Sequence, residues 1–385
     1  IFGLGLAGSN SLNYSKQSSE KFVYTKKTQA AFKLPKSGNN IFRIKITNND
    51  STKPQIYNSV FENIMIQRDT TINFVVESIG LWKKVNLSIE SKLNDIDFVD
   101  NKYGWIVGDG GLILYSSDGG DSWQKQDCPL VESLIAVDFI DSRTGWIFSQ
   151  NHILMTIDGG KIWNIKYSDS LWTWPYGDIQ FYNNNIGFVV CIRGHLMYGA
   201  VFKTTDGGET WQNITHQNLP YLTHISIVDE NNIWICGGLY HSIGSSSDSG
   251  LTWTFNPNAP PGFFSTIQFI DKYIGWVSGG SLYKTIDGGN TWLEQKLPIQ
   301  PPLFIAGPFY FFDLLNGWVA PKLNSETNGI FQTRNGGQTW ELFPVNVDLR
   351  DISSIFFIDK DLGWAIGTEG TIEKPVNVIL KFKRQ

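Results

Sequence analysis

The sequence predicts an all-β fold, a seven-bladed β-propeller, from three observations. A Gly-rich box that ends in Trp occurs six times, a signature centred on Gly-Trp occurs seven times, and the composition favours strands and tight turns. Of the 385 residues, 14% are aromatic, 17% are charged and 38 are Gly. Units of about 40 residues that each carry four short strands are typical of propeller blades.

The Gly-rich box is the first repeated element, and it reads KTTDGGETW at residues 203–211. Its Asp and hydroxyl groups suit hydrogen bonds to turn backbone, and its Gly residues suit positive φ. Six equivalent metal loops would need more oxygen ligands than one Asp in each. We therefore interpret one residue in each box as structural, neither catalytic nor metal-binding: Asp118, Asp158, Asp206, Asp248, Asp287 and Asn335. The terminal Trp residues recur every 39 to 48 residues, at Trp123, Trp163, Trp211, Trp253, Trp292 and Trp340.

The second signature precedes each box and marks the first two strands of a blade. It reads FIDSRTGW in the second unit, where an inner strand is expected to enter it and a second strand to leave it. Its last residue stands at Trp105, Trp146, Phe188, Trp234, Trp276, Trp318 and Trp364.

The seventh unit lacks the box, because the sequence runs from its signature through TIEKPVNVILKFKRQ to residue 385. GLWKKVNL around Trp82 can supply the missing outer strand, so this N-terminal strand is expected to close the ring. Such closure leaves few exposed sheet edges. The propeller is thus predicted over residues 80–385. Residues 1–79 are predicted to form a short N-terminal β extension, partly disordered or a small β segment, with strands near KFVYTKK, NIFRIKITNN and TTINFVV.

Charge and composition narrow the function classes. A net charge of −5 with seven Arg gives no basic stripe, so no nucleic-acid partner is expected. No run approaches the roughly 20 apolar residues of a spanning helix, so the chain is not expected to span a membrane itself. The opening IFGLGLAGSNS resembles the end of a signal peptide, which predicts an exported protein: periplasmic, cell-surface or extracellular. The three Cys residues fit neither a metal site nor a disulfide framework.

The S/T-x-D-G-G-x-T-W box resembles the Asp box of BNR-repeat proteins. Its pairing with the Gly-Trp signature over residues 80–385 is similar to the Ycf48-like family of photosystem II assembly factors. The resemblance implies a non-enzymatic propeller that binds protein as an assembly or scaffold factor. The boxes depart from the pattern at Asn335, Ser249 and Ile162, and the chain lacks the Arg-rich surface of members that act on photosystem II. It therefore implies a wider role, for a membrane-associated or extracytoplasmic complex.

Long connections in blades two to four are expected on the face opposite the Asp boxes, including KYSDSLWTWPYGD as a loop. Aromatic and Arg anchors are typical of protein interfaces. The candidate binding face consists of Trp172, Trp174, Tyr176, Arg193, His195, Tyr198, Tyr221, His224, Tyr240 and His241. The same aromatic residues could instead fold over the propeller or hold a glycan. A zinc site from His195, His224 and His241 has no close-spaced pair, so no metal and no cofactor is expected.

A ring of inner-strand residues is expected at the mouth of the central channel: Asp95, Ala136, Asp178, His224, Thr266, Pro308 and Ser354. The alternative function is a carbohydrate-active propeller, either a glycan-binding module or a glycoside hydrolase of xyloglucanase-like or sialidase-like type. A hydrolase needs two carboxylates across the scissile bond. Sialidases have six blades and carry a Phe/Tyr-Arg-Ile-Pro element, whereas here Phe42-Arg43-Ile44 is followed by Lys45. Xyloglucanases pair two propellers across a cleft, and this chain has one. The face looks aromatic and His-containing, so an enzyme is not expected, although two buried, neighbouring carboxylates at the channel mouth would favour one.

Overall fold

A computed structural model describes residues 81–169, 172–193, 198–215, 219–238, 242–298, 307–320, 329–345, 347–371 and 373–384, and six strands before residue 81. The chain divides into two compact units, residues 1–79 and residues 80–384. All elements of this described part are strands. Within it, no helix is long and apolar enough to cross a membrane.

The N-terminal unit contains two sheets. One has the order β1-β2-β4-β5, with β2 and β4 parallel, and the other pairs β3 with β6. The strands expected near KFVYTKK, NIFRIKITNN and TTINFVV are present as β2, β4 and β6, whereas β1, β3 and β5 were not expected. The bounds are β1 Asn13–Lys16, β2 Glu20–Tyr24, β3 Ala30–Lys33, β4 Asn39–Asn48, β5 Gln55–Met65 and β6 Thr71–Phe74.

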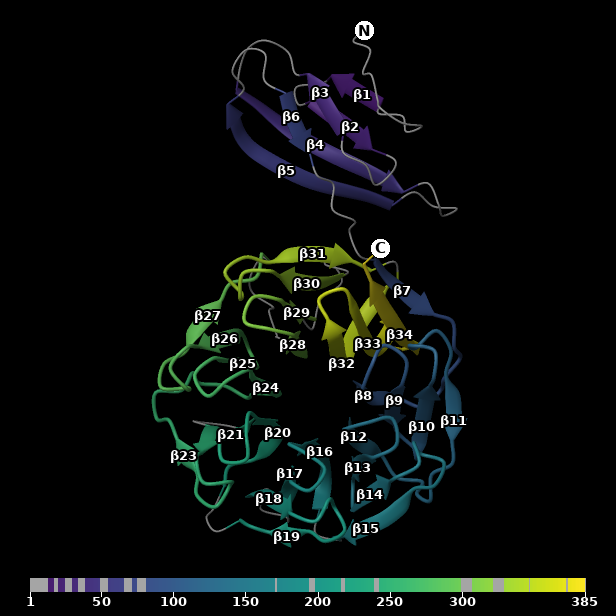
Figure 1. Ribbon diagram of the computed structural model, residues 1–385, viewed down its shortest axis with the longest axis vertical. Helices are drawn as coiled ribbons and strands as arrows, with labels where there is room; N and C mark the ends of the chain where they lie inside the picture. Colours follow the sequence, from purple (N-terminus) through teal and green to yellow (C-terminus); the bar gives the residue numbers. More distant parts are fainter. Residues whose placement is uncertain are drawn as a thin grey trace. The chain divides into compact units, whose positions relative to one another are not determined.

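The second unit is the predicted seven-bladed propeller (Figure 1). Each blade is a four-stranded antiparallel sheet whose first strand lies nearest the central axis. Blades one to four consist of β8 Leu93–Phe98, β9 Gly104–Gly108, β10 Leu112–Ser116, β11 Gln124–Gln126; β12 Leu134–Phe139, β13 Gly145–Ser149, β14 His152–Thr156, β15 Asn164–Ser168; β16 Trp172–Phe181, β17 Gly187–Arg193, β18 Tyr198–Thr204, β19 Gln212–Asn213; and β20 Leu222–Ile227, β21 Ile233–Gly237, β22 Ile243–Ser246, β23 Thr254–Phe255. Blades five to seven consist of β24 Thr266–Phe269, β25 Gly275–Ser278, β26 Leu282–Thr285, β27 Leu293–Gln295; β28 Phe309–Phe311, β29 Gly317–Val319, β30 Gly329–Thr333, β31 Glu341–Pro344; and β32 Leu349–Asp359, β33 Leu362–Gly370, β34 Pro375–Lys383 with β7 Leu81–Val85.

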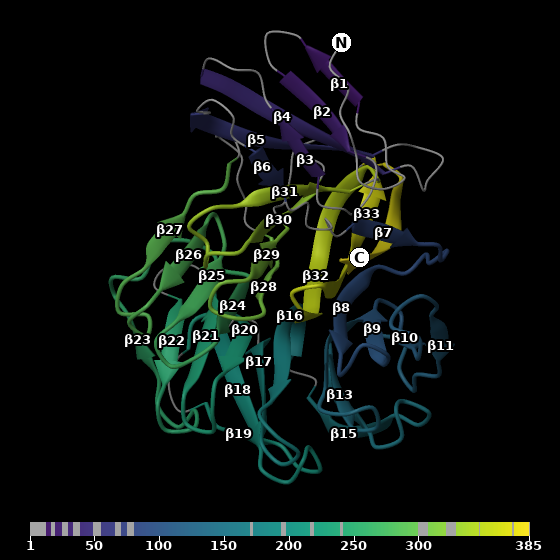
Figure 2. The same ribbon diagram turned by 45° about the horizontal axis from the view of Figure 1, so that its top comes forward.

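Blade seven closes the ring as predicted. Strand β7 pairs antiparallel with β34, with Leu81 opposite Lys383 and Trp82 opposite Phe382. Both views place β7 at the outer edge of this blade (Figures 1 and 2). The Trp82 side chain is buried, and its ring lies 5.7 Å from those of Trp318 and Phe357 and 5.4 Å from that of Phe382. The outer strand therefore carries a large apolar anchor into the core between blades six and seven.

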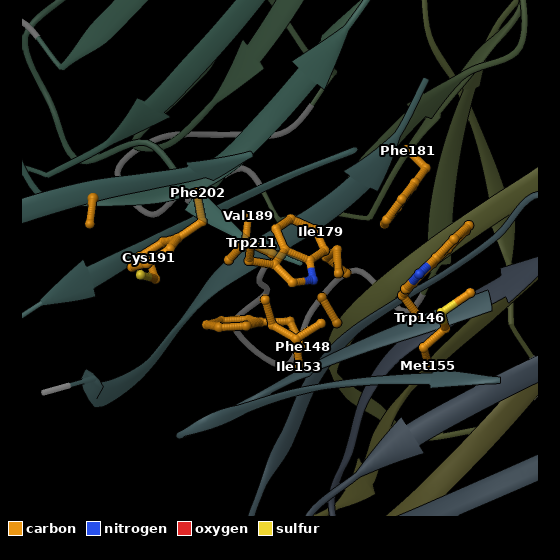
Figure 3. Close-up of a cluster of buried hydrophobic side chains, with 12 residues drawn as sticks. Trp146, Phe148, Ile153, Met155, Ile179, Phe181, Val189, Cys191, Phe202 and Trp211 are labelled. Carbon is orange, nitrogen blue, oxygen red and sulfur yellow. The ribbon is translucent and has the colours of Figure 1, made fainter. Parts of the chain in front are cut away.

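The two repeated signatures interlock between neighbouring blades. In blade two, the Trp146 ring stacks on Phe181 of blade three at 3.4 Å, and Trp211 meets the same Phe181 ring edge-on at 5.8 Å (Figure 3). The indole N–H of Trp146 donates to the carbonyl of Gly207, in the Asp box of blade three. The same hydrogen bond to the next box joins Trp105 to Gly159, Trp234 to Gly288 and Trp364 to Gly119. The Gly-Trp signature is therefore a link to the next blade.

Blade three lacks this indole donor, because Phe188 stands in the Trp position. Lys203 lies over the Phe188 ring, 5.3 Å from its centroid, and its ammonium donates to the carbonyl and hydroxyl of Ser249 in the box of blade four. Ser249 occupies a Gly position with φ of 63°, a left-handed conformation that is uncommon for residues with a side chain. A lysine thus replaces the indole link here.

The box itself is a turn built around its carboxylate. The Asp206 carboxylate accepts the backbone N–H and hydroxyl of Thr210 and the hydroxyl of Thr204, at 2.6 to 2.9 Å. These bonds, led by that from the Thr210 hydroxyl, lower the pKa of Asp206. Blade six uses an amide in place of the carboxylate, and Asn335 Nδ2 donates to the Thr339 hydroxyl at 2.8 Å.

One prediction of local structure was wrong. The aromatic residues within KYSDSLWTWPYGD, expected as a loop, form the first half of β16, and residue 172 pairs with residue 193 of β17. The register shifts between residues 172 and 177, so a bulge interrupts the pairing. Aromatic residues have high strand propensity, and the long β17 hairpin offers them a pairing edge.

Candidate functional site

A cavity of about 750 Å³ lies at the centre of the propeller, and the inner strands of all seven blades line it. The seven ring residues predicted from the sequence all lie on its wall. A second ring follows two residues later on each strand, because alternate side chains of a strand face the same side. This second ring consists of Asp97, Asp138, Gln180, Ser226, Gln268, Tyr310 and Phe356.

In blades one to five, the residue of the second ring hydrogen-bonds its blade to the next one. Asp97 Oδ2 accepts the backbone N–H of Phe139 at 2.7 Å, and Asp138 Oδ2 accepts that of Phe181 at 2.7 Å. The inner edge of each inner strand has no sheet neighbour, so its N–H groups need such acceptors. Equivalent bonds join Gln180 to Ile227, Ser226 to Phe269 and Gln268 to Phe311. Sequence analysis missed this ring, although its two-residue offset from the first could have revealed it.

The first ring makes two bonds of the same kind. Asp95 Oδ2 accepts the N–H of Val137 at 2.9 Å, and its Oδ1 accepts the Ser354 hydroxyl at 2.8 Å. Asp178 Oδ2 accepts the N–H of Ile225 at 3.1 Å and lies 3.3 Å from His224 Nδ1. Asp178 and His224, two members of the predicted ring of which His224 also belongs to the predicted binding face, are therefore brought together as a pair.

Burial raises the pKa of the cavity carboxyls. Desolvation, opposed by the Val137 hydrogen bond, raises the pKa of Asp95 to about 6. Desolvation and the nearby Asp95 charge raise the pKa of Asp97 to about 7, although the hydrogen bonds from the backbone N–H groups of Phe139 and Phe98 lower it in part. Burial and the Asp97 charge raise the pKa of Asp138 well above its usual range, and burial also raises that of Asp178. The channel mouth, which looked aromatic and His-containing in the sequence, therefore also holds buried, neighbouring carboxylates.

Three aromatic side chains stand at the mouth of the cavity, on the same side of the propeller as the first ring. The Tyr176 and Tyr221 rings lie 6.2 Å apart, and Tyr221 lies 5.5 Å from Phe263. Tyr176 is 45% exposed and Phe263 is 41% exposed, and both line the cavity. Phe263 was not predicted, although it stands three residues before the ring residue Thr266, as Tyr221 does before His224. We refer to Tyr176, Tyr221 and Phe263 as the aromatic rim.

The other predicted binding residues are placed differently. Arg193 and Tyr198 face each other across the β17–β18 hairpin, away from the cavity wall, and the Arg193 guanidinium lies 3.0 Å from Asp169 Oδ2. Residues Trp172 and Trp174 belong to β16, but their side chains lie outside the described residues, as do His195, Tyr240 and His241 altogether. Among the residues with described positions, no three His, Cys, Asp or Glu side chains are arranged to hold a metal ion.

The comparisons with known proteins agree with this architecture. The family described as "Photosynthesis system II assembly factor YCF48" matches residues 75–219. The structure "YCF48 bound to D1 peptide" has a TM-score of 0.63 at 18% identity and covers 79% of this chain and 97% of its own. The structure of YCF48 from Cyanidioschyzon merolae has a TM-score of 0.61 at 21% identity, covering 79% and 98%.

A glycoside hydrolase shares the fold at lower similarity. The GH74 xyloglucanase from Xanthomonas campestris has a TM-score of 0.56 at 11% identity, and covers 77% of this chain but only 55% of its own. No curated protein sequence matches the chain. The family match over residues 75–219 and the two YCF48 structures confirm the resemblance predicted from the repeats: the chain is similar to the Ycf48-like family, and residues 80–384 form a seven-bladed propeller of the same fold.

Proposed function

We propose that this protein is a non-enzymatic propeller that binds a segment of a partner protein at the channel mouth, as an assembly or scaffold factor. The observation that carries the proposal is the cavity of about 750 Å³ with an aromatic rim above buried carboxylates. A concave site with aromatic anchors and a few convergent polar groups is typical of binding sites. The similar structure of YCF48 with a D1 peptide supports a polypeptide ligand.

The charge of the cavity specifies the ligand further. Asp95, Asp97, Asp138 and Asp178 belong to blades one to three, and all line the same space. A Lys or Arg side chain of the partner would stabilise their ionised forms, since an opposite charge nearby favours ionisation. The expected ligand is therefore an extended segment with an apolar or aromatic residue for the rim and a cationic residue for the cavity.

The setting is also part of the proposal. The similar family is described as an assembly factor for photosystem II, which is a membrane complex, and this supports a membrane-associated setting. We place this protein outside the cytoplasm, with a membrane-associated complex as its partner and no nucleic-acid ligand.

A glycoside hydrolase is the second candidate, and one observation favours it: the cavity holds neighbouring carboxylates with raised pKa, as a catalytic acid requires. Two features count against it. All four carboxylates accept backbone N–H groups from the next blade. The similar xyloglucanase is nearly twice as long as the region that matches here.

Selection of peptide ligands by the intact chain and by a variant with substitutions in the aromatic rim tests the proposal. The intact chain and a Tyr176→Ala, Tyr221→Ala variant would be used to select binders from a displayed random-peptide library, with folding verified by thermal melting. Tyr182→Ala is the matched control, because Tyr182 is similarly exposed at 44% but lies in the β16–β17 turn on the Asp-box face. We expect peptides that carry Lys or Arg beside an apolar residue, retained by the control and lost by the rim variant. Peptides that bind all three chains equally would contradict the proposal, and release of oligosaccharides from xyloglucan would replace it with the enzyme.

A further inference from the structure

The aromatic rim occupies a position that the propeller fold leaves open to several residue types. Tyr221 and Phe263 each stand three residues before the first-ring residue of their blade. The same position holds Lys92 in blade one, Ser133 in blade two and Asp351 in blade seven, and these residues also line the cavity. Charged, hydroxyl and aromatic side chains are therefore all compatible with the position, so the fold alone does not account for aromatic residues in consecutive blades.

The three rings of the rim follow the arc of the cavity mouth. They belong to blades three, four and five, whose inner strands β16, β20 and β24 follow one another around the central axis (Figure 1). The ring planes of Tyr176 and Tyr221 are inclined by 49°, and those of Tyr221 and Phe263 by 59°, so the rings are not stacked flat on one another. Tyr176 and Phe263 both stay exposed. The rim therefore leaves aromatic surface available to a ligand.

The cavity next to the rim is acidic. Six Asp residues line it, and Lys92 is the only Lys or Arg among the lining residues that the structure describes. Asp178 follows Tyr176 by two residues, and both line the cavity. The face of an aromatic ring attracts a cation that lies within about 6 Å of the ring centroid, and nearby carboxylates add to this attraction. The rim therefore suits a cationic ligand better than a neutral apolar one.

The hydrogen bonds of Asp178 indicate which kind of cation fits. Its Oδ1 accepts the backbone N–H of Ile179 at 2.9 Å, and its Oδ2 accepts that of Ile225 at 3.1 Å and lies 3.3 Å from His224 Nδ1. A Lys ammonium brings three N–H donors, and a donor that loses water without gaining an acceptor is costly. A quaternary ammonium carries the same charge without any N–H donor, and aromatic rings recognise it through its methyl groups.

We propose that the aromatic rim binds a quaternary ammonium group, which the partner segment carries as a trimethylated Lys side chain. The inference rests on the proposed function, because that segment is the ligand proposed for this mouth. The stem of the side chain is apolar and uncharged, so only its tip is attracted by the carboxylates. The headgroup of a choline lipid fits this site less well, because the carboxylates of the cavity would repel the phosphate that lies close to its ammonium.

Ligand-observed NMR titration of the full chain with three small amides tests the inference. The titration is run at about pH 8, where Asp95 and Asp97 are ionised. The ligands are the N-acetyl amides of trimethyllysine, of lysine and of a neutral isostere with carbon in place of the charged nitrogen. We expect the trimethyllysine amide to bind about tenfold more tightly than either of the others. Equal affinity for any two that include the trimethyllysine amide, or no binding of it, would overturn the inference.

A variant of the rim locates the binding site. Tyr176→Ala should lose the tenfold preference, because it removes one aromatic face beside Asp178. Tyr182→Ala is the matched control, since Tyr182 is similarly exposed but lies in the β16–β17 turn, and it should keep the preference. Thermal melting verifies that both variants are folded. A folded Tyr176→Ala chain that keeps the preference would overturn the inference.

The selection of peptides by the rim separates failure of this inference from failure of the proposed function. Rim-dependent peptides together with equal binding of the three amides would overturn this inference and leave the proposed function in place. A trimethyllysine preference without any rim-dependent peptide would keep the ammonium site but overturn its occupation by a partner segment. Rim-dependent flotation of the chain with phosphatidylcholine vesicles would then identify a lipid headgroup as the ligand.

Discussion

Replacement of Asp97 by Asn should remove a pH dependence of stability that the wild-type chain shows between about pH 4 and about pH 8. Asp97 is 8% exposed and its pKa is raised from 3.8 to about 7, chiefly by burial. Above the unfolded pKa the unfolded chain releases this proton while the folded chain keeps it. Stability therefore falls as the pH rises, and the loss is complete once the folded pKa is passed.

The size of the effect follows from the shift. About three pKa units correspond to about 4 kcal/mol, because each unit is worth 1.36 kcal/mol. Relative to wild type, the free energy of unfolding of Asp97→Asn should therefore increase by up to about 4 kcal/mol as the pH rises from about 4 to about 8. A constant cost of about 1 kcal/mol is expected at every pH, since Asn offers one acceptor oxygen where Asp97 binds two N–H groups.

Guanidinium unfolding at several pH values measures both quantities. Asp97→Ala separates them, because it lacks the charge and both acceptors: its stability should follow the same pH profile as that of Asp97→Asn but lie about a further 1–3 kcal/mol lower, with the Phe139 N–H left unpaired. If the wild-type and Asp97→Asn profiles ran parallel across this range, the carboxyl would not be carrying a raised pKa and the reasoning would be refuted.

Three other outcomes are expected. Trp82→Ala should cost about 3–5 kcal/mol in denaturant unfolding, since it empties the apolar anchor of the closing strand, and a loss under 1 kcal/mol would show that the ring closes without it. Trp364→Phe should cost about 1–3 kcal/mol by thermal melting, because the Gly119 carbonyl loses its buried indole donor. Binding of a selected basic peptide should tighten as the pH rises through about 6, where Asp95 ionises, and titration calorimetry that finds no change would argue against a cationic residue in the cavity.

The scaffold was predictable because its chemistry is repeated. The box occurs six times and the Gly-Trp signature seven times, so the blades could be recognised even where single residues depart from the pattern. The seventh unit lacks an outer strand, and this indicated that the segment around Trp82 supplies it. The blade-three exception could be recognised as Phe188, but its replacement by Lys203 could not, because the two side chains meet only across the sheet and reach Ser249 in the next blade.

The candidate site was only partly predictable. The equivalent position in each repeat, three residues before the inner-strand aromatic residue or Ile, identified the first ring, and the aromatic content of the loops identified Tyr176 and Tyr221. The raised pKa of Asp97 could not be read from the sequence, since it results from desolvation by seven strands that converge from the whole chain. The strand character of residues 172–176 was missed because it depends on the partner edge offered by β17.

The closing pair of strands has a mechanical consequence. Leu81 of β7 lies opposite Lys383 of β34, so the two chain ends of the propeller leave from the same end of one antiparallel ladder. Tension applied across residues 81 and 383 would load the first pair of the ladder alone, then the next, and would peel the strands apart in sequence. A ladder loaded along its length would share the force among all its hydrogen bonds. The buried Trp82 side chain therefore stabilises the closed ring against thermal unfolding. The β7–β34 pairing nevertheless offers little mechanical resistance to a force applied between residues 81 and 383.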